Sequence, residues 1–241
     1  MKTIFAASLI FLLLSSTEAI SQFKLPKILS KNNPTSGITE NEAGQGIKEA
    51  LTQGVTNAVL NLNKTDGFFG SDIYKMLLPP DAKKIESTLR RMGMNAQVDK
   101  AILAINRGAE DAVAYAKPIF VDAIKEMTLT DALNIVSGKK DAATQYFKQR
   151  TTEKLIAAFK PSVQSSLDKV NATKYYGDIV TTYNKLPTTF NKVNPDLTSF
   201  VVAKAVDALF DQVAKEEANI RANPAARATD ILKKVFGSVI K

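Results

Sequence analysis

Apolar side chains recur at helical spacing along almost the whole chain after residue 40. One such stripe contains Ile47, Leu51, Val55 and Val59. Intervals of four residues place these side chains on one face of an α-helix, and that face has to be buried. Gly54 lies in the same stripe and indicates a close contact with another helix, because glycine has no side chain to hold a neighbour away. No segment shows the clear alternation of apolar and polar residues that is typical of a half-buried strand.

Proline and glycine residues divide this pattern into separate helices. Gly93 and Gly138 each follow an apolar stripe, and Pro161 interrupts another. The expected helices span residues 41–63, 81–92, 96–116, 118–127, 128–136, 141–159, 161–170, 174–185 and 195–221, with a last one ending before Gly237. Short connections favour antiparallel neighbours, so the sequence predicts an all-α, single-domain multi-helix bundle of about ten helices.

The N-terminus has the pattern of a cleaved targeting signal. Lys2 precedes an apolar run at residues 4–14 that is too short to span a bilayer, and Thr17 and Ala19 are the small residues expected before a cut. The expected division is a signal peptide, a flexible leader and an all-α domain, at residues 1–19, 20–40 and 41–241. The chain has no cysteine for lipid attachment, so we expect a soluble periplasmic protein and not a lipoprotein.

Histidine is absent as well as cysteine. Catalysis by Ser-His-Asp or Cys-His groups is therefore excluded, as are zinc sites with nitrogen or sulfur ligands and histidine-bound haem. No cofactor, metal site or catalytic residue is predicted. Any chemistry would have to use carboxylates, lysine, tyrosine, serine or threonine.

The formal net charge is +8, with an isoelectric point of about 9.4. Such a balance could favour nucleic acid, anionic lipid headgroups or cell-wall polymers. However, the basic residues are spread along the chain, with 26 lysines to 6 arginines, whereas bidentate phosphate recognition prefers arginine. We interpret the charge mainly as a contribution to solubility and expect no nucleic-acid partner.

Three groups of residues stand out: residues 106–110, residues 141–147, and a C-terminal set at 205–210, 217, 220–221, 223–224 and 233–237. Together they resemble an exported bacterial family called domain of unknown function 4197. The likeness covers about residues 45–238. Gly108 stands where the family usually has alanine, and Ala208 where it has glycine. The resemblance implies a helical, exported, bacterial protein and brings no known activity, ligand or catalytic residue.

Asn106, Arg107 and Glu110 form a polar cluster on the helix expected at 96–116. Asn106 and Glu110 are four residues apart and lie at the rim of an apolar stripe, where they could bind a ligand or brace a neighbouring element. Bracing is the commoner role, because buried polar groups need hydrogen-bond partners. Arg107 is expected to form a surface ion pair with Asp111.

Asp141 and Thr144 lie in the first turn of the helix expected at 141–159. The simpler interpretation is that they cap exposed backbone amides. The alternative is an anion site, because Lys139, Lys140 and free amides would converge there. Tyr146 follows on the buried side and completes the set of candidate polar residues.

Weaker patterns are interpreted as structural. Ser-x-x-Lys spacings at Ser21, Ser137 and Ser166 match those of some acyl-transfer enzymes, but the companion sequences of those enzymes are absent. Residues 61–72 only loosely imitate a calcium-binding loop, since Asp66 holds the position that needs glycine. Glu216 and Glu217 alternate with lysines, which is typical of a solvated helix face.

The best functional hypothesis is a non-catalytic binding protein of the cell envelope. Its partner would be an apolar or lipid-like ligand between helices, or another protein. One alternative is an enzyme with carboxylate, tyrosine and lysine chemistry around Glu110, Asp141 and Tyr146. The other is electrostatic association with anionic envelope surfaces.

Overall fold

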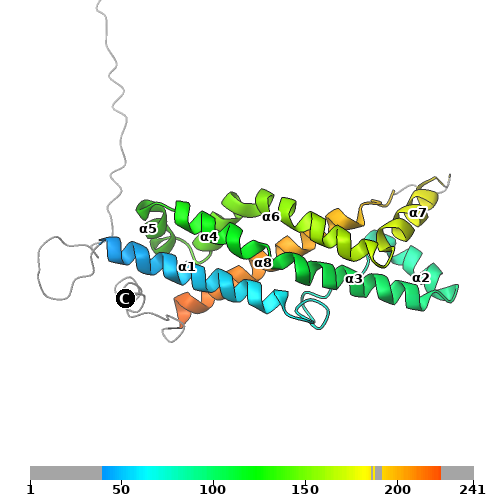
Figure 1. The fold of residues 1–241 in the computed structure, drawn as a ribbon, viewed down its shortest axis with the longest axis horizontal. Coiled ribbons are helices and arrows are strands. Elements are labelled where there is room, and N and C mark those ends of the chain that lie inside the picture. The colour runs from blue at the N-terminus through cyan, green and yellow to red at the C-terminus, as the bar shows by residue number, and fades with distance from the viewer. Residues whose placement is uncertain (1–39, 186, 188–191, 224–241) are drawn as a thin grey trace, which may run out of the picture.

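The described part of the chain folds entirely into helices and connecting loops. The computed structural model describes residues 40–185, 187 and 192–223 (Figure 1). The helices are α1 (Glu40–Asn63), a one-turn 3-10 helix (Pro80–Ala82), α2 (Lys83–Arg91), α3 (Asn95–Val113), α4 (Ala116–Glu126), α5 (Leu129–Ser137), α6 (Ala142–Asp168), α7 (Ala172–Asn184) and α8 (Leu197–Ala222). The all-α prediction is confirmed for these residues.

The prediction of about ten helices is not matched. The two helices expected at 141–159 and 161–170 are a single helix, α6. The last expected helix, the signal peptide and nearly all of the leader lie outside the described residues.

Pro161 lies inside α6 and does not end it. A proline in a helix removes one backbone donor and crowds the carbonyl four residues earlier, here that of Ala157. Pro161 and Ala157 are both exposed, so water can bond this carbonyl. On the opposite side, Phe159 and Val163 are completely buried and hold both halves of the helix against the core.

Local sequence signals set several helix ends as expected. α5 begins with a capping box: the Thr128 hydroxyl accepts from the Asp131 backbone amide at 3.1 Å, and the Asp131 carboxylate accepts from the Thr128 amide at 3.0 Å. Gly93 follows α2 with a φ of 82°. The start of α8 differs from the expectation, because its N-cap is Asp196 and not Asn194.

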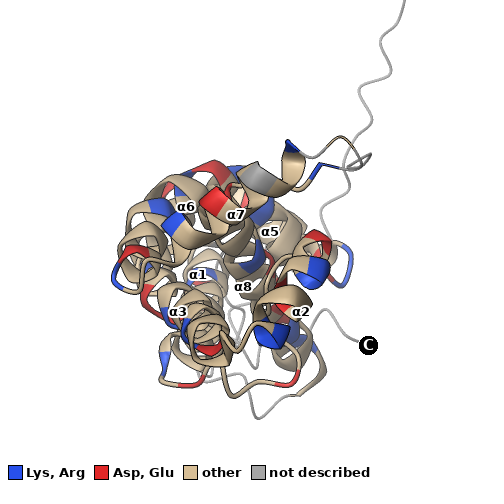
Figure 2. Ribbon diagram, turned by 90° about the vertical axis from the view of Figure 1, so that its right-hand side faces the viewer, with Lys and Arg blue, Asp and Glu red and all other residues tan. Residues whose placement is uncertain are grey.

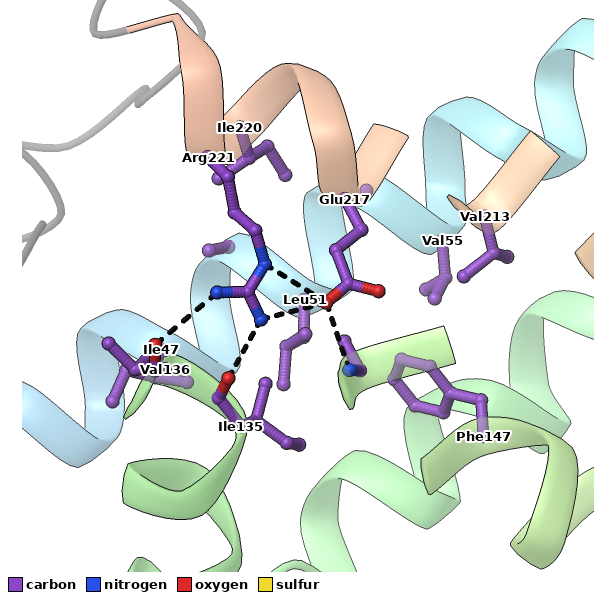
Figure 3. A pocket seen from close by; sticks show the side chains of 13 residues that line it. Ile47, Leu51, Val55, Ile135, Val136, Phe147, Val213, Glu217, Ile220 and Arg221 are labelled. Atoms are coloured by element: carbon purple, nitrogen blue, oxygen red, sulfur yellow. Dashed lines mark hydrogen bonds and ion pairs between the residues drawn. The ribbon is translucent and has the colours of Figure 1, made fainter. Parts of the chain in front are cut away.

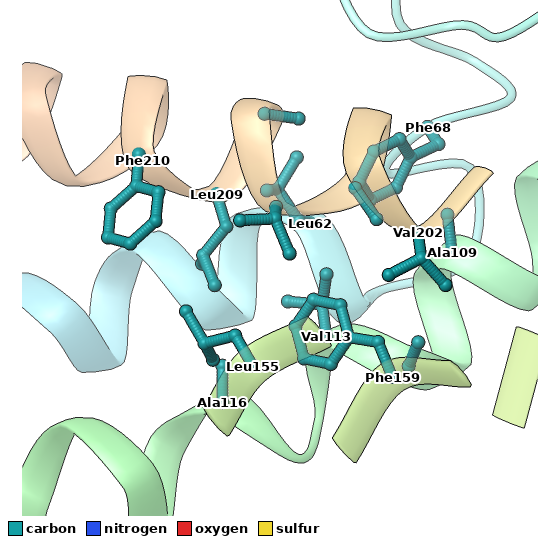
Figure 4. Packing of buried hydrophobic residues seen from close by; sticks show 14 of the residues in the cluster. Leu62, Phe68, Ala109, Val113, Ala116, Leu155, Phe159, Val202, Leu209 and Phe210 are labelled. Carbon is teal, nitrogen blue, oxygen red and sulfur yellow. The ribbon is translucent and has the colours of Figure 1, made fainter. Parts of the chain in front are cut away.

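The helices form an elongated bundle (Figure 1). α1, α3, α4, α6 and α8 pack against one another along its length, whereas α5 lies at one end and α2 and α7 lie at the other. Their inward faces meet in one apolar cluster (Figure 4). Phe159 and Leu155 of α6 lie in it beside Leu209 of α8 and Val113 of α3.

Two glycines allow helices to approach closely. A Cβ atom at Gly54 would lie 3.3 Å from Ile220 Cδ1, so α8 crosses α1 where the sequence predicted a close contact. A Cβ atom at Gly108 would lie 3.0 Å from Ser166 Cβ and 3.4 Å from Val163 Cα. The alanine that the resembled family usually has at 108 would therefore push α6 away from α3 by a few tenths of an ångström.

Candidate functional site

Glu110 is a buried carboxylate that holds the loop between α1 and α2. Its side chain lies on α3, and Oε1 accepts hydrogen bonds from the backbone amides of Phe68 at 3.0 Å and Phe69 at 3.1 Å. Arg107 Nη1 donates to the other carboxylate oxygen at 2.6 Å, and Arg107 Nη2 donates to Asp66 at 2.8 Å. The expected pairing of Arg107 with Asp111 is therefore wrong.

Asn106 holds the same loop one turn earlier on α3. Its side chain is completely buried. Its Oδ1 accepts from the Met76 backbone amide and its Nδ2 donates to the Met76 carbonyl, both at 2.8 Å. Asn106 and Glu110 thus brace the 64–79 loop, which is the commoner of the two roles considered for them.

Asp141 and Thr144 belong to a different cluster, at the start of α6. Asp141 forms no capping hydrogen bond. The cap comes from Glu217 on α8, which accepts from the amides of Ala143 at 3.0 Å and Thr144 at 2.9 Å, and from the Thr144 hydroxyl at 2.7 Å. The anion site suggested for the start of this helix is therefore occupied by the carboxylate of Glu217. Glu217 is only 8% exposed, so its assignment to a solvated face is wrong.

Arg221 completes this cluster and joins three helices (Figure 3). Its guanidinium donates to Glu217 Oε1 at 2.8 and 3.1 Å, to the carbonyl of Ile135 at 2.7 Å and to that of Val136 at 3.3 Å. These carbonyls lie near the C-terminus of α5, where a cation is favourable. A cavity of about 40 Å³ lies beside the cluster and is walled mainly by apolar side chains. It has room for a water molecule or two and not for a lipid chain.

Tyr146 lies apart from both clusters. Its hydroxyl donates to the carbonyl of Ala123 at 3.4 Å, and the guanidinium carbon of Arg150 lies 5.6 Å from the centre of its ring. Burial, together with the charge of Asp131, raises its pKa. The enzyme hypothesis grouped Tyr146 with Glu110 and Asp141, but these three side chains have different partners.

Two hollows large enough for a ligand lie elsewhere, at the end of the bundle that carries α2 and α7. This end faces the viewer in Figure 2. We use the name end groove for a hollow of about 620 Å³ between α2, α3 and α7. Its apolar lining includes Ile85, Leu89, Val98, Ala101, Tyr176 and Ile179. A second hollow of about 470 Å³ continues from it along α2 and α7, and shares Ile85, Leu89 and Ile179.

Large apolar side chains stay exposed around the end groove. Tyr175 is 55% exposed and lines the groove, and Met92 is 69% exposed and lines its continuation. Among the described residues that line the end groove itself, the charged ones are Lys100 and Lys169. The sequence does not reveal this place, because α7 is far from α2 and α3 in the chain. One sequence signal for this site is Met92, a large apolar residue next to Gly93, where the helix ends.

Tyr176 in the groove wall provides a test of burial at this end of the bundle. Its hydroxyl donates to the carbonyl of Asn194 at 3.1 Å. Burial, with a contribution from the charge of Asp81, raises the pKa of Tyr176 to about 12. The folded state thus binds this proton more tightly than the unfolded state, whose tyrosines titrate near ~10. The resulting stabilisation is complete below pH ~10 and is lost as the pH rises toward ~12.

We expect the absorbance difference at the phenolate band between the native protein and the Tyr176→Phe variant to titrate about two pH units above free tyrosine. Circular dichroism at each pH checks that the helices persist. A difference that titrates like free tyrosine while the helices persist would show that Tyr176 is solvated.

Two wider properties of the described residues bear on function. They contain no group of three or more acidic residues placed to hold a metal ion. Within the same residues, no helix combines the length and apolar character needed to cross a bilayer.

Comparison with known proteins places the chain in a family. No curated protein and no solved structure matches it. A family model described as protein of unknown function (DUF4197) matches residues 37–237, which is most of the chain. The chain therefore belongs to the DUF4197 family.

Proposed function

We propose that this protein is a non-catalytic binding protein, exported to the bacterial periplasm by residues 1–19, and that its end groove takes the apolar chain of an anionic, lipid-like molecule. The observation that carries the proposal is the end groove itself, a hollow of about 620 Å³ with a mainly apolar lining. Ligand sites in proteins commonly have this size and character.

The charges around the groove support an acidic headgroup. Lys100 on α3 and Lys169 after α6 both line the hollow, and Lys84 on α2 lines its continuation. Of the nearby carboxylates, Asp99 is paired with Arg90 at 2.9 Å and Asp168 accepts from Gln164 at 2.8 Å. Asp178 also lines the continuation, so the positive charge is concentrated at the end groove itself, at Lys100 and Lys169. An ammonium group at the edge of an apolar groove attracts an anion more strongly than one surrounded by water.

Native mass spectrometry of the mature protein, purified from the periplasm, tests whether a ligand is bound. We expect a fraction of the protein to carry an added lipid-sized mass that is lost on unfolding. Titration with cis-parinarate, a fluorescent fatty acid anion, then gives the affinity.

Matched variants locate the binding. Ala101→Trp fills the groove from α3, whereas Leu103→Trp adds the same ring at an exposed position of the same helix that does not line the groove. We expect the first to weaken parinarate binding at least tenfold and the second to leave it unchanged. Charge reversal at Lys100 and Lys169 should also weaken binding. The proposal fails if the mass is that of the bare chain and parinarate does not bind, or if both tryptophan variants bind it equally well.

A further inference from the structure

The 64–79 loop is held rigidly although it contains no helix. Its amides at Phe68 and Phe69 are bound by Glu110, and both backbone polar groups of Met76 are bound by Asn106. Between these points the Ser71 hydroxyl accepts from the Tyr74 amide at 3.1 Å. The loop is thus fixed to α3 at two buried places.

The same loop is fixed to α8 through Tyr74. The Tyr74 hydroxyl donates to Asp211 at 2.6 Å and accepts from Lys215 at 2.6 Å. Lys215 also lies 2.9 Å from Asp211. The hydrogen bonds from Tyr74 and Lys215 lower the pKa of Asp211, so this carboxylate is charged and engaged within the protein.

Apolar side chains are nevertheless left exposed on this rigid loop. Ile73 is 72% exposed and Leu77 is 54% exposed. Both line a hollow of about 600 Å³ between the loop and α8, and Met76, Phe200 and Ala208 also contribute to its wall. We call this hollow and its rim the loop–α8 face.

The rim of the loop–α8 face carries an excess of positive charge. Lys75, Lys83 and Lys204 line the hollow, and none of them forms an ion pair with the described residues. The carboxylates in the lining are Asp207 and Asp211, the second of which is already bound to Lys215. A partner that suits this face therefore has apolar side chains flanked by acidic ones.

We propose that the loop–α8 face is a docking surface for a polypeptide segment that presents apolar side chains with acidic residues beside them. A rigid surface loses little conformational entropy on binding, which favours a specific partner. The apolar groups line a hollow that can receive side chains, which suits a polypeptide better than the flat surface of a membrane. This surface meets the end groove at Leu78, which lines both hollows, but the proposal does not depend on the function proposed for that groove.

Site-specific photocrosslinking in cells that produce the exported protein tests the proposal. A benzophenone amino acid replaces Leu77, and the control carries it at Leu60, which is 59% exposed on α1 and does not line the hollow. We expect an adduct with one polypeptide from position 77 only, attached within an acidic segment. The charge-reversal variants Lys83→Glu and Lys204→Glu should reduce this adduct at least fivefold, while circular dichroism shows unchanged folding.

A synthetic peptide of the crosslinked segment then gives the affinity. We expect the purified protein to bind it at least tenfold more tightly than a version with its acidic residues changed to lysine. A lipid adduct at Leu77, or binding to vesicles of phosphatidylglycerol that depends on the same lysines, would overturn the proposal in favour of a membrane contact. It is also overturned if position 77 gives no adduct beyond that of position 60, or if charge reversal has no effect.

Discussion

Replacing Glu217 with alanine will lower the free energy of unfolding by about 3–5 kcal/mol. The side chain is 8% exposed and supplies both the cap of α6 and the partner of Arg221. Its loss leaves the amides of Ala143 and Thr144 without their acceptor in a buried place, and leaves a largely buried guanidinium without its carboxylate. Urea unfolding followed by circular dichroism measures the change.

Two variants separate this role from a general effect of charge. Glu216→Ala removes the neighbouring carboxylate, which is half-buried and accepts one hydrogen bond from Asn57 at 3.2 Å, and it should cost less than about 1 kcal/mol. The double variant Glu217→Ala with Arg221→Met removes the unpaired cation and should be more stable than the sum of the single effects predicts. Equal losses for Glu216→Ala and Glu217→Ala would contradict the assigned role.

Replacing Phe159 with alanine will also cost about 3–5 kcal/mol. The ring is completely buried where α6 faces α8 and α3, among Leu155, Leu209 and Val113 (Figure 4). Truncation removes its apolar contacts and leaves a cavity that the surrounding helices can fill only in part. The midpoint of urea unfolding should fall with little change in the slope.

Ile156→Ala is the matched control, since this residue lies on the same helix and is 42% exposed. It should cost less than about 1 kcal/mol. Phe159→Leu should keep most of the stability, because much of the apolar volume remains. A loss at Phe159→Ala no greater than that at Ile156→Ala would show that the ring does not occupy the core.

The spacing of apolar residues was enough to predict most of the helices, because each buries one stripe. The stripe containing Ile47, Val55 and Val59 is α1, and the cap at Thr128 starts α5. Pro161 was misjudged because the local rule for proline does not include the packing of Phe159 and Val163, which holds both halves of α6 in place.

The role of Glu217 could not be predicted from its neighbours along the chain. A glutamate that follows Lys215 and Glu216 has the composition of a solvated face, and the amides that it caps lie more than 70 residues away in the sequence. A signal was present nevertheless: Glu217 continues the helical register of Val213, which is buried. Asn106 and Glu110 were recognised because they lie beside an apolar stripe, but the loop that they hold depends on the tertiary fold.

The attachment of Met76 to Asn106 has a consequence for how the exposed face can change. Asn106 binds the backbone amide and carbonyl at this position and makes no use of the side chain. Every residue type except proline offers the same two groups, so this anchor does not depend on the exposed side chains of the loop. Ile73, Lys75 and Leu77 can therefore be exchanged, in evolution or by design, to change what the proposed docking face would bind, while the framework beneath keeps its shape.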